Sequence, residues 1–103
     1  MAHVEYVLPL GDRVRKRHIH ETTGTLVISF VVQLEVSLDG RWLPVVRYDC
    51  AHGFSHVHWY KRSGEFRREP LSLSFAESLT MADEDILEGW ETHRNRFVEG
   101  EWP

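Results

Sequence analysis

The sequence has a single cysteine, Cys50, among 103 residues, which excludes an internal disulfide and indicates a reducing compartment. It contains no run of about 18 apolar residues, and its first residues lack the basic and apolar segments of a signal peptide. Repeats, low-complexity tracts and flexible linkers are also missing, which predicts one domain over residues 1–103. We therefore expect a cytoplasmic single-domain protein that does not contact a membrane.

Acidic and basic side chains are divided unevenly along the chain, whose net charge is −4. Residues 1–70 hold ten Lys and Arg against eight Asp and Glu, a net of +2, whereas residues 71–103 hold two against eight, a net of −6. The negative net charge argues against a protein that binds nucleic acid through its overall electrostatic attraction. The short basic clusters either coat a solvated sheet edge, where they block edge-to-edge pairing, or bind RNA or another anionic partner. They comprise Arg13, Arg15, Lys16, Arg17, Lys61, Arg62, Arg67 and Arg68.

A long β-strand is the clearest structural signal. Every even position from Leu26 to Leu38 is apolar, and this period-two pattern predicts a strand with one buried face. Asp39-Gly40 follows, a pair that tolerates the positive φ angles of a tight hairpin turn, so residues 41–49 are predicted to return as an antiparallel strand. Pro44 has no backbone donor and must face away from the ladder or lie at a bulge.

The rest of the chain predicts an α+β fold. Residues 13–21, 56–61 and 65–69 have the character of further strands, which gives an antiparallel meander of about four to five strands over residues 13–70. Residues 1–12 are expected to be loose or extended. Apolar residues then recur at helical spacing after Ser74, which predicts a long helix over residues 74–98, or two abutting helices, packed on one face of the sheet. Trp90 and Phe97 are predicted to join the core under this helix.

Reactive side chains are densest between Arg47 and His58. In a regular two-residue hairpin, Phe30 lies opposite Asp49 and Val32 opposite Arg47, which directs both charged side chains onto the apolar face; a one-residue bulge reverses this. Two interpretations are open for these charges. In the first, Arg47 pairs with Asp49 or with helix carboxylates such as Glu84, Glu88 or Glu91. In the second, both residues form the floor of a pocket in which Asp49 orients a histidine and Arg47 neutralises an anion.

His56 and His58 are two residues apart on a predicted strand, so their side chains leave the same face. With His52 or Asp49 they have the residue types for a divalent metal ion, although the spacing matches no established metal motif. The alternatives are metal-free acid–base chemistry and simple ordering of the loop. Nothing in the sequence indicates an organic cofactor. His18 and His20 form a second pair, which we expect to be separate and at the surface.

The segment Arg47-Tyr48-Asp49, followed by Ala51-His52-Gly53-Phe54 and His56, resembles the R-Y-D-x-A-H-G-F signature of a small prokaryotic domain family of unknown function. The similarity extends over about residues 25–98. The same segment resembles, more distantly, TumE-type toxins of toxin–antitoxin pairs. The sequence thus supports two hypotheses. The first is a binding or accessory domain with a His-rich sheet-end site, which contacts a protein partner or another copy of itself. The second, implied by the toxin resemblance, is a TumE-like or small nuclease-like enzyme whose candidate catalytic residues are Arg47, Asp49, His52, His56 and His58.

Overall fold

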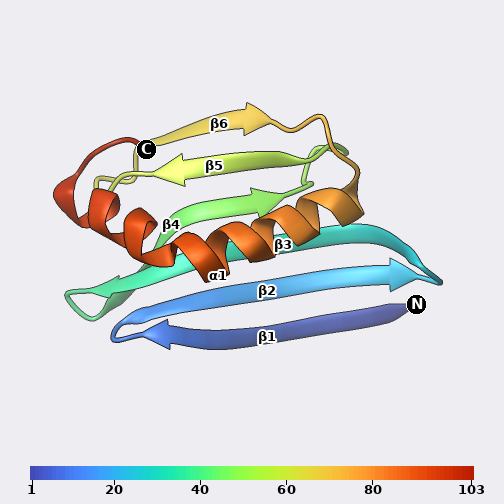
Figure 1. Ribbon diagram of the computed structural model, residues 1–103, viewed down its shortest axis with the longest axis horizontal. Helices are drawn as coiled ribbons and strands as arrows, with labels where there is room; N and C mark the ends of the chain where they lie inside the picture. Colours follow the sequence, from blue (N-terminus) through green and yellow to red (C-terminus); the bar gives the residue numbers. More distant parts are fainter.

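In the computed structural model, which describes residues 1–103, one antiparallel sheet of six strands is followed by a single helix (Figure 1). Each strand pairs with its neighbours in sequence, in the order β1-β2-β3-β4-β5-β6. No helix is long and apolar enough to cross a membrane. The elements are β1 (Ala2–Gly11), β2 (Val14–Thr23), β3 (Leu26–Leu38), β4 (Arg41–Asp49), β5 (His56–Tyr60), β6 (Phe66–Pro70) and α1 (Phe75–Glu99).

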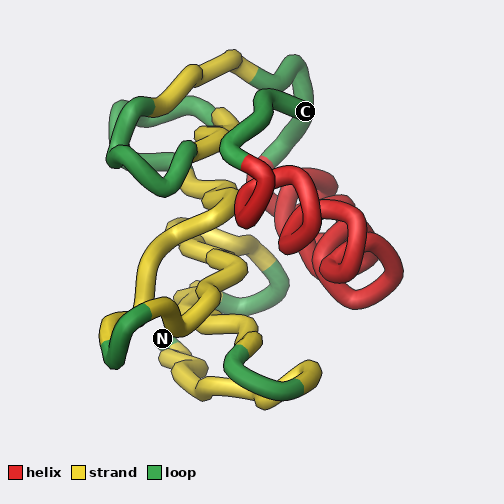
Figure 2. The backbone as a smooth tube through the Cα atoms, turned by 90° about the vertical axis from the view of Figure 1, so that its left-hand side faces the viewer, coloured by secondary structure: helices red, strands yellow, loops and turns green.

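The helix packs on one face of the sheet and leaves the other without a covering element (Figure 2). We call these the helix face and the open face. The core lies between α1 and the central strands β3 and β4, so burial is concentrated on the helix face. Its fully buried apolar residues include Phe30, Val32, Leu34, Val46, Ile86 and Phe97. This is the expected α+β arrangement, with the predicted apolar positions of β3 from Phe30 to Val36 turned toward the helix.

The predicted hairpin between β3 and β4 is confirmed. Leu38 pairs with Arg41 across the turn, and both turn residues have positive φ, 52° at Asp39 and 76° at Gly40. Such angles suit a type I′ turn, whose twist matches that of the two strands.

The helix is one continuous element of 25 residues. Ser74 and Glu77 form a reciprocal capping box at its start, and Gly100 closes its end in the left-handed conformation. Phe97 is fully buried, as predicted. Trp90 packs at the margin of the core against Gly11, where a Cβ atom would lie 2.7 Å from the indole ring. Only glycine therefore fits this position without a shift of the ring.

The sheet has six strands, and the expectation of four to five was wrong. The additional strand is β1, formed by residues expected to be loose or extended; it pairs along its length with β2, from Ala2 opposite Thr22 to Gly11 opposite Val14. Nine of its ten residues are exposed because it is an edge strand, which the helix approaches where Trp90 packs against Gly11. An edge strand in contact with solvent on both faces has no need of strict alternation, which is why its sequence signal is weak.

The register of β4 also differs from the regular hairpin. Asp49 lies opposite Val31, and Arg47 lies opposite Gln33. The reason is a β-bulge: β4 has one extra residue, the buried Val45, between the pairs Glu35–Pro44 and Leu34–Val46. Arg47 and Asp49 therefore project from the open face. The regular hairpin that would direct them onto the apolar face is not formed, and the bulge reverses their direction. Pro44 explains the bulge, since it has no N–H to offer the ladder.

Candidate functional site

Four of the five predicted site residues come from two paired strands on the open face. Asp49 lies opposite His56 and Arg47 opposite His58 in the β4–β5 ladder, so the four side chains leave the same face. The fifth, His52, is exposed in the connecting loop, and its ring stacks on that of His56 with 5.7 Å between centroids. The structure thus brings all five residues together. We call this group the open-face site.

Asp49 is the centre of the open-face site, with only 3% of its surface exposed. Its Oδ2 atom accepts a hydrogen bond of 2.5 Å from Arg47 Nε, and its Oδ1 atom accepts one of 3.2 Å from the Ala51 N–H. Burial alone would raise the pKa of this carboxyl, but the hydrogen bonds from Arg47 and Ala51 outweigh it and hold the pKa below its ordinary value. The group is therefore a buried carboxylate anion at neutral pH.

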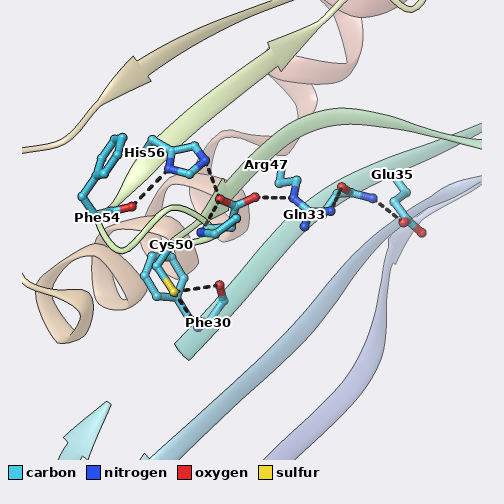
Figure 3. Close-up of polar contacts among 9 residues, drawn as sticks. Phe30, Gln33, Glu35, Arg47, Cys50, Phe54 and His56 are labelled. Carbon is cyan, nitrogen blue, oxygen red and sulfur yellow. Dashed lines mark hydrogen bonds and ion pairs between the residues drawn. The ribbon is translucent and has the colours of Figure 1, made fainter. Parts of the chain in front are cut away.

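The predicted ion pair between Arg47 and Asp49 is present. The alternative partners, the carboxylates of the helix, lie on the other side of the sheet and are excluded by the register. Arg47 Nη1 is also 3.4 Å from the side-chain oxygen of Gln33, whose amide donates to Glu35 at 2.7 Å (Figure 3). Glu35 in turn accepts from Arg15 and Arg17 of β2. A row of polar contacts thus crosses the open face and fixes the guanidinium of Arg47.

His56, which is 1% exposed, faces the Phe54 carbonyl (Figure 3). Its other ring nitrogen lies beside Asp49. Its Nδ1 atom is 3.1 Å from the Phe54 carbonyl oxygen. A carbonyl only accepts, so the ring proton is assigned to Nδ1, and a neutral His56 directs the lone pair of Nε2 away from Phe54. That Nε2 atom is 2.6 Å from Asp49 Oδ1 but has no aligned hydrogen bond. Two acceptors at this distance repel unless a cation, either a proton or a metal ion, lies with them.

His58 completes the arrangement. Its Nδ1 atom is buried and has no hydrogen-bond partner. Burial lowers the pKa of His58, against the opposing effect of Asp49, and so favours a neutral ring with a free lone pair. One ligand atom each from Asp49, His56 and His58 lie within 4.8 Å of one another. The open-face site therefore gathers a carboxylate oxygen and two imidazole nitrogens around one point.

A second polar cluster lies on the helix face, and sequence reasoning missed it. Lys16 is 2% exposed, and its ammonium donates to Asp83 of α1 at 2.8 Å and to the Tyr6 hydroxyl at 3.0 Å. The expectation that Lys16 lies at a solvated edge of the sheet was wrong. Lys16 is two residues from Val14, so both side chains leave the same face of β2, and this spacing could have indicated that Lys16 is buried. His18 lies beside it, 3% exposed, so its predicted surface position was also wrong. The prediction that it is separate from the other histidine pair is correct, because the two pairs occupy opposite faces.

A third contact joins β4 to the helix. The buried Tyr48 hydroxyl donates to Asp85 at 2.8 Å, and His93 Nε2 lies 2.9 Å from the same carboxylate oxygen. Burial would raise the pKa of Asp85, but these two partners outweigh it and lower the pKa. Because all three groups lie where the helix packs on the sheet, their role is to fix the helix in place.

Comparison with known proteins gives a family but no activity. A family model described as "Domain of unknown function (DUF7718)" matches residues 1–102. No curated protein and no solved structure matches the chain.

Proposed function

The chain belongs to this family of unknown function, and we propose from the geometry of the open-face site that it is a binding domain whose ligand is a divalent transition-metal ion. Asp49, His56 and His58 are the three protein ligands. The observation that carries the proposal is the buried Nε2 atom of His56, which lies 2.6 Å from Asp49 Oδ1 without an aligned hydrogen bond; if both atoms act as acceptors, they repel. A metal ion bound by both atoms converts this repulsion into coordination.

The donor set suits such an ion. Two imidazoles and a carboxylate are ligands for Zn²⁺ and for Fe²⁺, and sites with three protein ligands keep an open position for water or substrate. Ligand atoms about 2.0–2.1 Å from a tetrahedral Zn²⁺ stand about 3.3 Å from one another. The separations in the site, from 2.6 Å between Asp49 and His56 up to 4.8 Å across the group, bracket this value. Small side-chain movements are sufficient for binding.

The groups around the ligands also fit. Ligating histidines commonly donate their second ring N–H to a carbonyl, which fixes the tautomer, and His56 makes this contact with Phe54. Ligating carboxylates are commonly held by a further hydrogen bond, and Asp49 receives two, from Arg47 and Ala51. The contacts from Phe54 and Arg47 orient both ligands without using the coordinating atoms, whereas the Ala51 N–H shares Asp49 Oδ1, which keeps a second lone pair for an ion.

The test is calorimetric titration of Zn²⁺ into untagged protein freed of metal by dialysis against EDTA. We expect one ion per chain and at least a ~100-fold weaker affinity in His58→Ala, since loss of outer contacts alone typically costs 10–100-fold. The matched control is His20→Ala, because His18 and His20 have the same spacing on the opposite face. Undiminished Zn²⁺ binding in a folded His58→Ala protein, or an equal loss in His20→Ala, would contradict the proposal. Thermal melts of each variant establish that it is folded.

A second candidate function uses the same residues without a metal. The contact between Asp49 and His56 is that of an oriented acid–base pair, with Arg47 beside it to neutralise an anion. This is the arrangement that a TumE-like or nuclease-like enzyme would need, with His52 at its solvent side. Inhibition of growth on overexpression, abolished by His56→Ala in a protein that binds no Zn²⁺, would favour this candidate.

The predicted partners remain proposals. The strand β6 is exposed along its whole length and carries Arg67 and Arg68, which supports an anionic or protein partner at this edge. Part of this basic charge is engaged within the chain, since Lys61 and Arg67 both lie over the ring of Trp102.

A further inference from the structure

A pocket of about 360 Å³ adjoins the open-face site. Its lining is largely apolar and includes Ile19, Ile28, Val31 and Phe75, whereas Arg47 and Asp49 supply the charge. Its volume lies in the lower part of the 300–1,000 Å³ range of small-molecule sites, and a mostly apolar lining with a few polar groups is typical of them. Of the three proposed metal ligands, Asp49 lines the pocket, whereas His56 and His58 do not.

Two irregularities of the backbone create this pocket. The first is in β3, where Ile28 is an extra residue between the pairs Glu21–Ser29 and Thr22–Val27. The second is the loop after β4, which Cys50 anchors, since its Sγ accepts a hydrogen bond of 3.4 Å from the Phe30 N–H. The loop wall is therefore held to the main chain of Phe30 through the Cys50 side chain, and the other wall belongs to the paired strand β3.

One end of the pocket holds the ion pair of Arg47 and Asp49. Arg47 uses its Nε atom for Asp49 and has only a 3.4 Å contact at Nη1, while Nη2 has no hydrogen-bond partner in the protein. Its side chain is 35% exposed. The ion pair with Asp49 thus orients the guanidinium and leaves its outer N–H groups available. A guanidinium edge of this kind recognises carboxylate oxygens.

The opposite end of the pocket is apolar and open. Ile28 is 37% exposed, and Gly53 forms part of the wall with no side chain to fill the space. Apolar side chains that line an open pocket gain from contact with an apolar ligand surface. A fully polar ligand would make no apolar contacts with these side chains, and an uncharged ligand would make no ion pair with Arg47.

We propose that this pocket binds a small amphipathic carboxylate, with the carboxylate at the guanidinium of Arg47 and the apolar part over Ile19, Ile28 and Phe75. The site goes beyond the proposed metal centre and does not depend on it, because none of its contacts with the ligand uses His56 or His58. The metal and the carboxylate occupy opposite sides of Asp49.

The test is an NMR titration of ¹⁵N-labelled protein in EDTA with hexanoate, and with acetate and 1-hexanol as probes that lack the tail and the charge. We expect hexanoate to shift the amides of Ser29, Cys50 and Gly53 in a saturable way. Acetate loses the burial of four methylene groups and 1-hexanol loses the charged hydrogen bonds, so both should bind at least ~10-fold more weakly. Equal affinity for hexanoate and 1-hexanol, or shifts confined to other parts of the chain, would overturn the proposal.

Three variants locate the site. Arg47→Gln should lower the affinity for hexanoate at least ~10-fold and leave that for 1-hexanol unchanged. Ile28→Gln should lower the affinity for both hexanoate and 1-hexanol and leave the contacts of Asp49 intact. Val7→Gln is the control, because Val7 is exposed on the same face outside the pocket, and it should change neither affinity. A folded Ile28→Gln protein with unchanged hexanoate binding would refute the proposal. Because EDTA removes metal, failure of this titration and failure of Zn²⁺ binding are separate results.

Discussion

The buried pair between Lys16 and Asp83 leads to an asymmetric prediction. The two partners differ in exposure: the Lys16 side chain is 2% exposed and that of Asp83 31%. Removing Asp83 strands an ammonium group in the interior, whereas removing Lys16 leaves a carboxylate that water reaches. Loss of the more exposed partner should therefore be the more costly change.

The magnitudes follow from this difference. Breaking a buried ion pair typically costs 3–5 kcal/mol, and the Tyr6 hydroxyl remains as an acceptor for Lys16, so Asp83→Ala should lower the free energy of unfolding by about 3 kcal/mol. Lys16→Met replaces the ammonium with an apolar chain of similar length and should cost about 1 kcal/mol or less. The double variant should then be about 2 kcal/mol more stable than Asp83→Ala alone.

Urea unfolding followed by tryptophan fluorescence measures all three values, with the slope of the transition as a check that the unfolding remains two-state. The same differences should appear as shifts in Tm of about 4–8 °C per kcal/mol for a domain of this size. A Lys16→Met protein less stable than Asp83→Ala, or a double variant with no recovery, would refute the reasoning that desolvation of the ammonium dominates.

Two further predictions concern stability. Tyr48→Phe removes the hydrogen bond to the charged Asp85 and should cost about 1.5 kcal/mol in urea unfolding; no loss would mean that the 2.8 Å contact does not stabilise the fold. Glu35 has a pKa below its ordinary value, because hydrogen bonds from two arginines of β2 and from a glutamine outweigh the effect of burial. The unfolded chain therefore binds more protons at this group, so its contribution to stability is present above about pH 4.5 and is lost as the pH falls through the folded pKa. Unfolding at pH 6 and pH 3.5 should show a smaller acid loss in Glu35→Gln than in wild type. The control is Glu65→Gln, at an exposed residue whose side chain makes no ion pair, and it should match wild type.

Much of the fold could be predicted because its signals are local. The alternation of β3, the Asp39-Gly40 turn and the capping box at Ser74 each specify a conformation within a few residues. The strand β1 could not be predicted in the same way, since an edge strand exposed on both faces carries no periodic constraint. Its presence depends on pairing with β2, which is a property of the folded sheet.

The candidate site was predictable as a set of residues but not as a geometry. The composition of the segment from Arg47 to His58 drew attention to the side chains that the structure gathers, and the period-two pattern placed His56 and His58 on one face. The bulge at Val45 determines that Asp49, His56 and His58 lie on the open face. In the sequence, Pro44 was the only indication of this bulge. The pairing of Lys16 with Asp83 joins residues 67 positions apart, and no local pattern specifies such a contact.

The bulge at Val45 also makes the chain sensitive to its own length. In β4, odd-numbered side chains face the helix before Val45 and even-numbered ones face it afterwards. One inserted or deleted residue between Val45 and Asp49 would therefore move the side chains of the helix face to the open face and the reverse. Tyr48 would then turn to solvent and Asp49 would be forced under the helix. A change of that kind removes the core and the site together, whereas the exposed ends of β1 and β6 can vary in length with little effect on either. Natural variation in chain length should therefore be found at the two edges of the sheet and not at its centre.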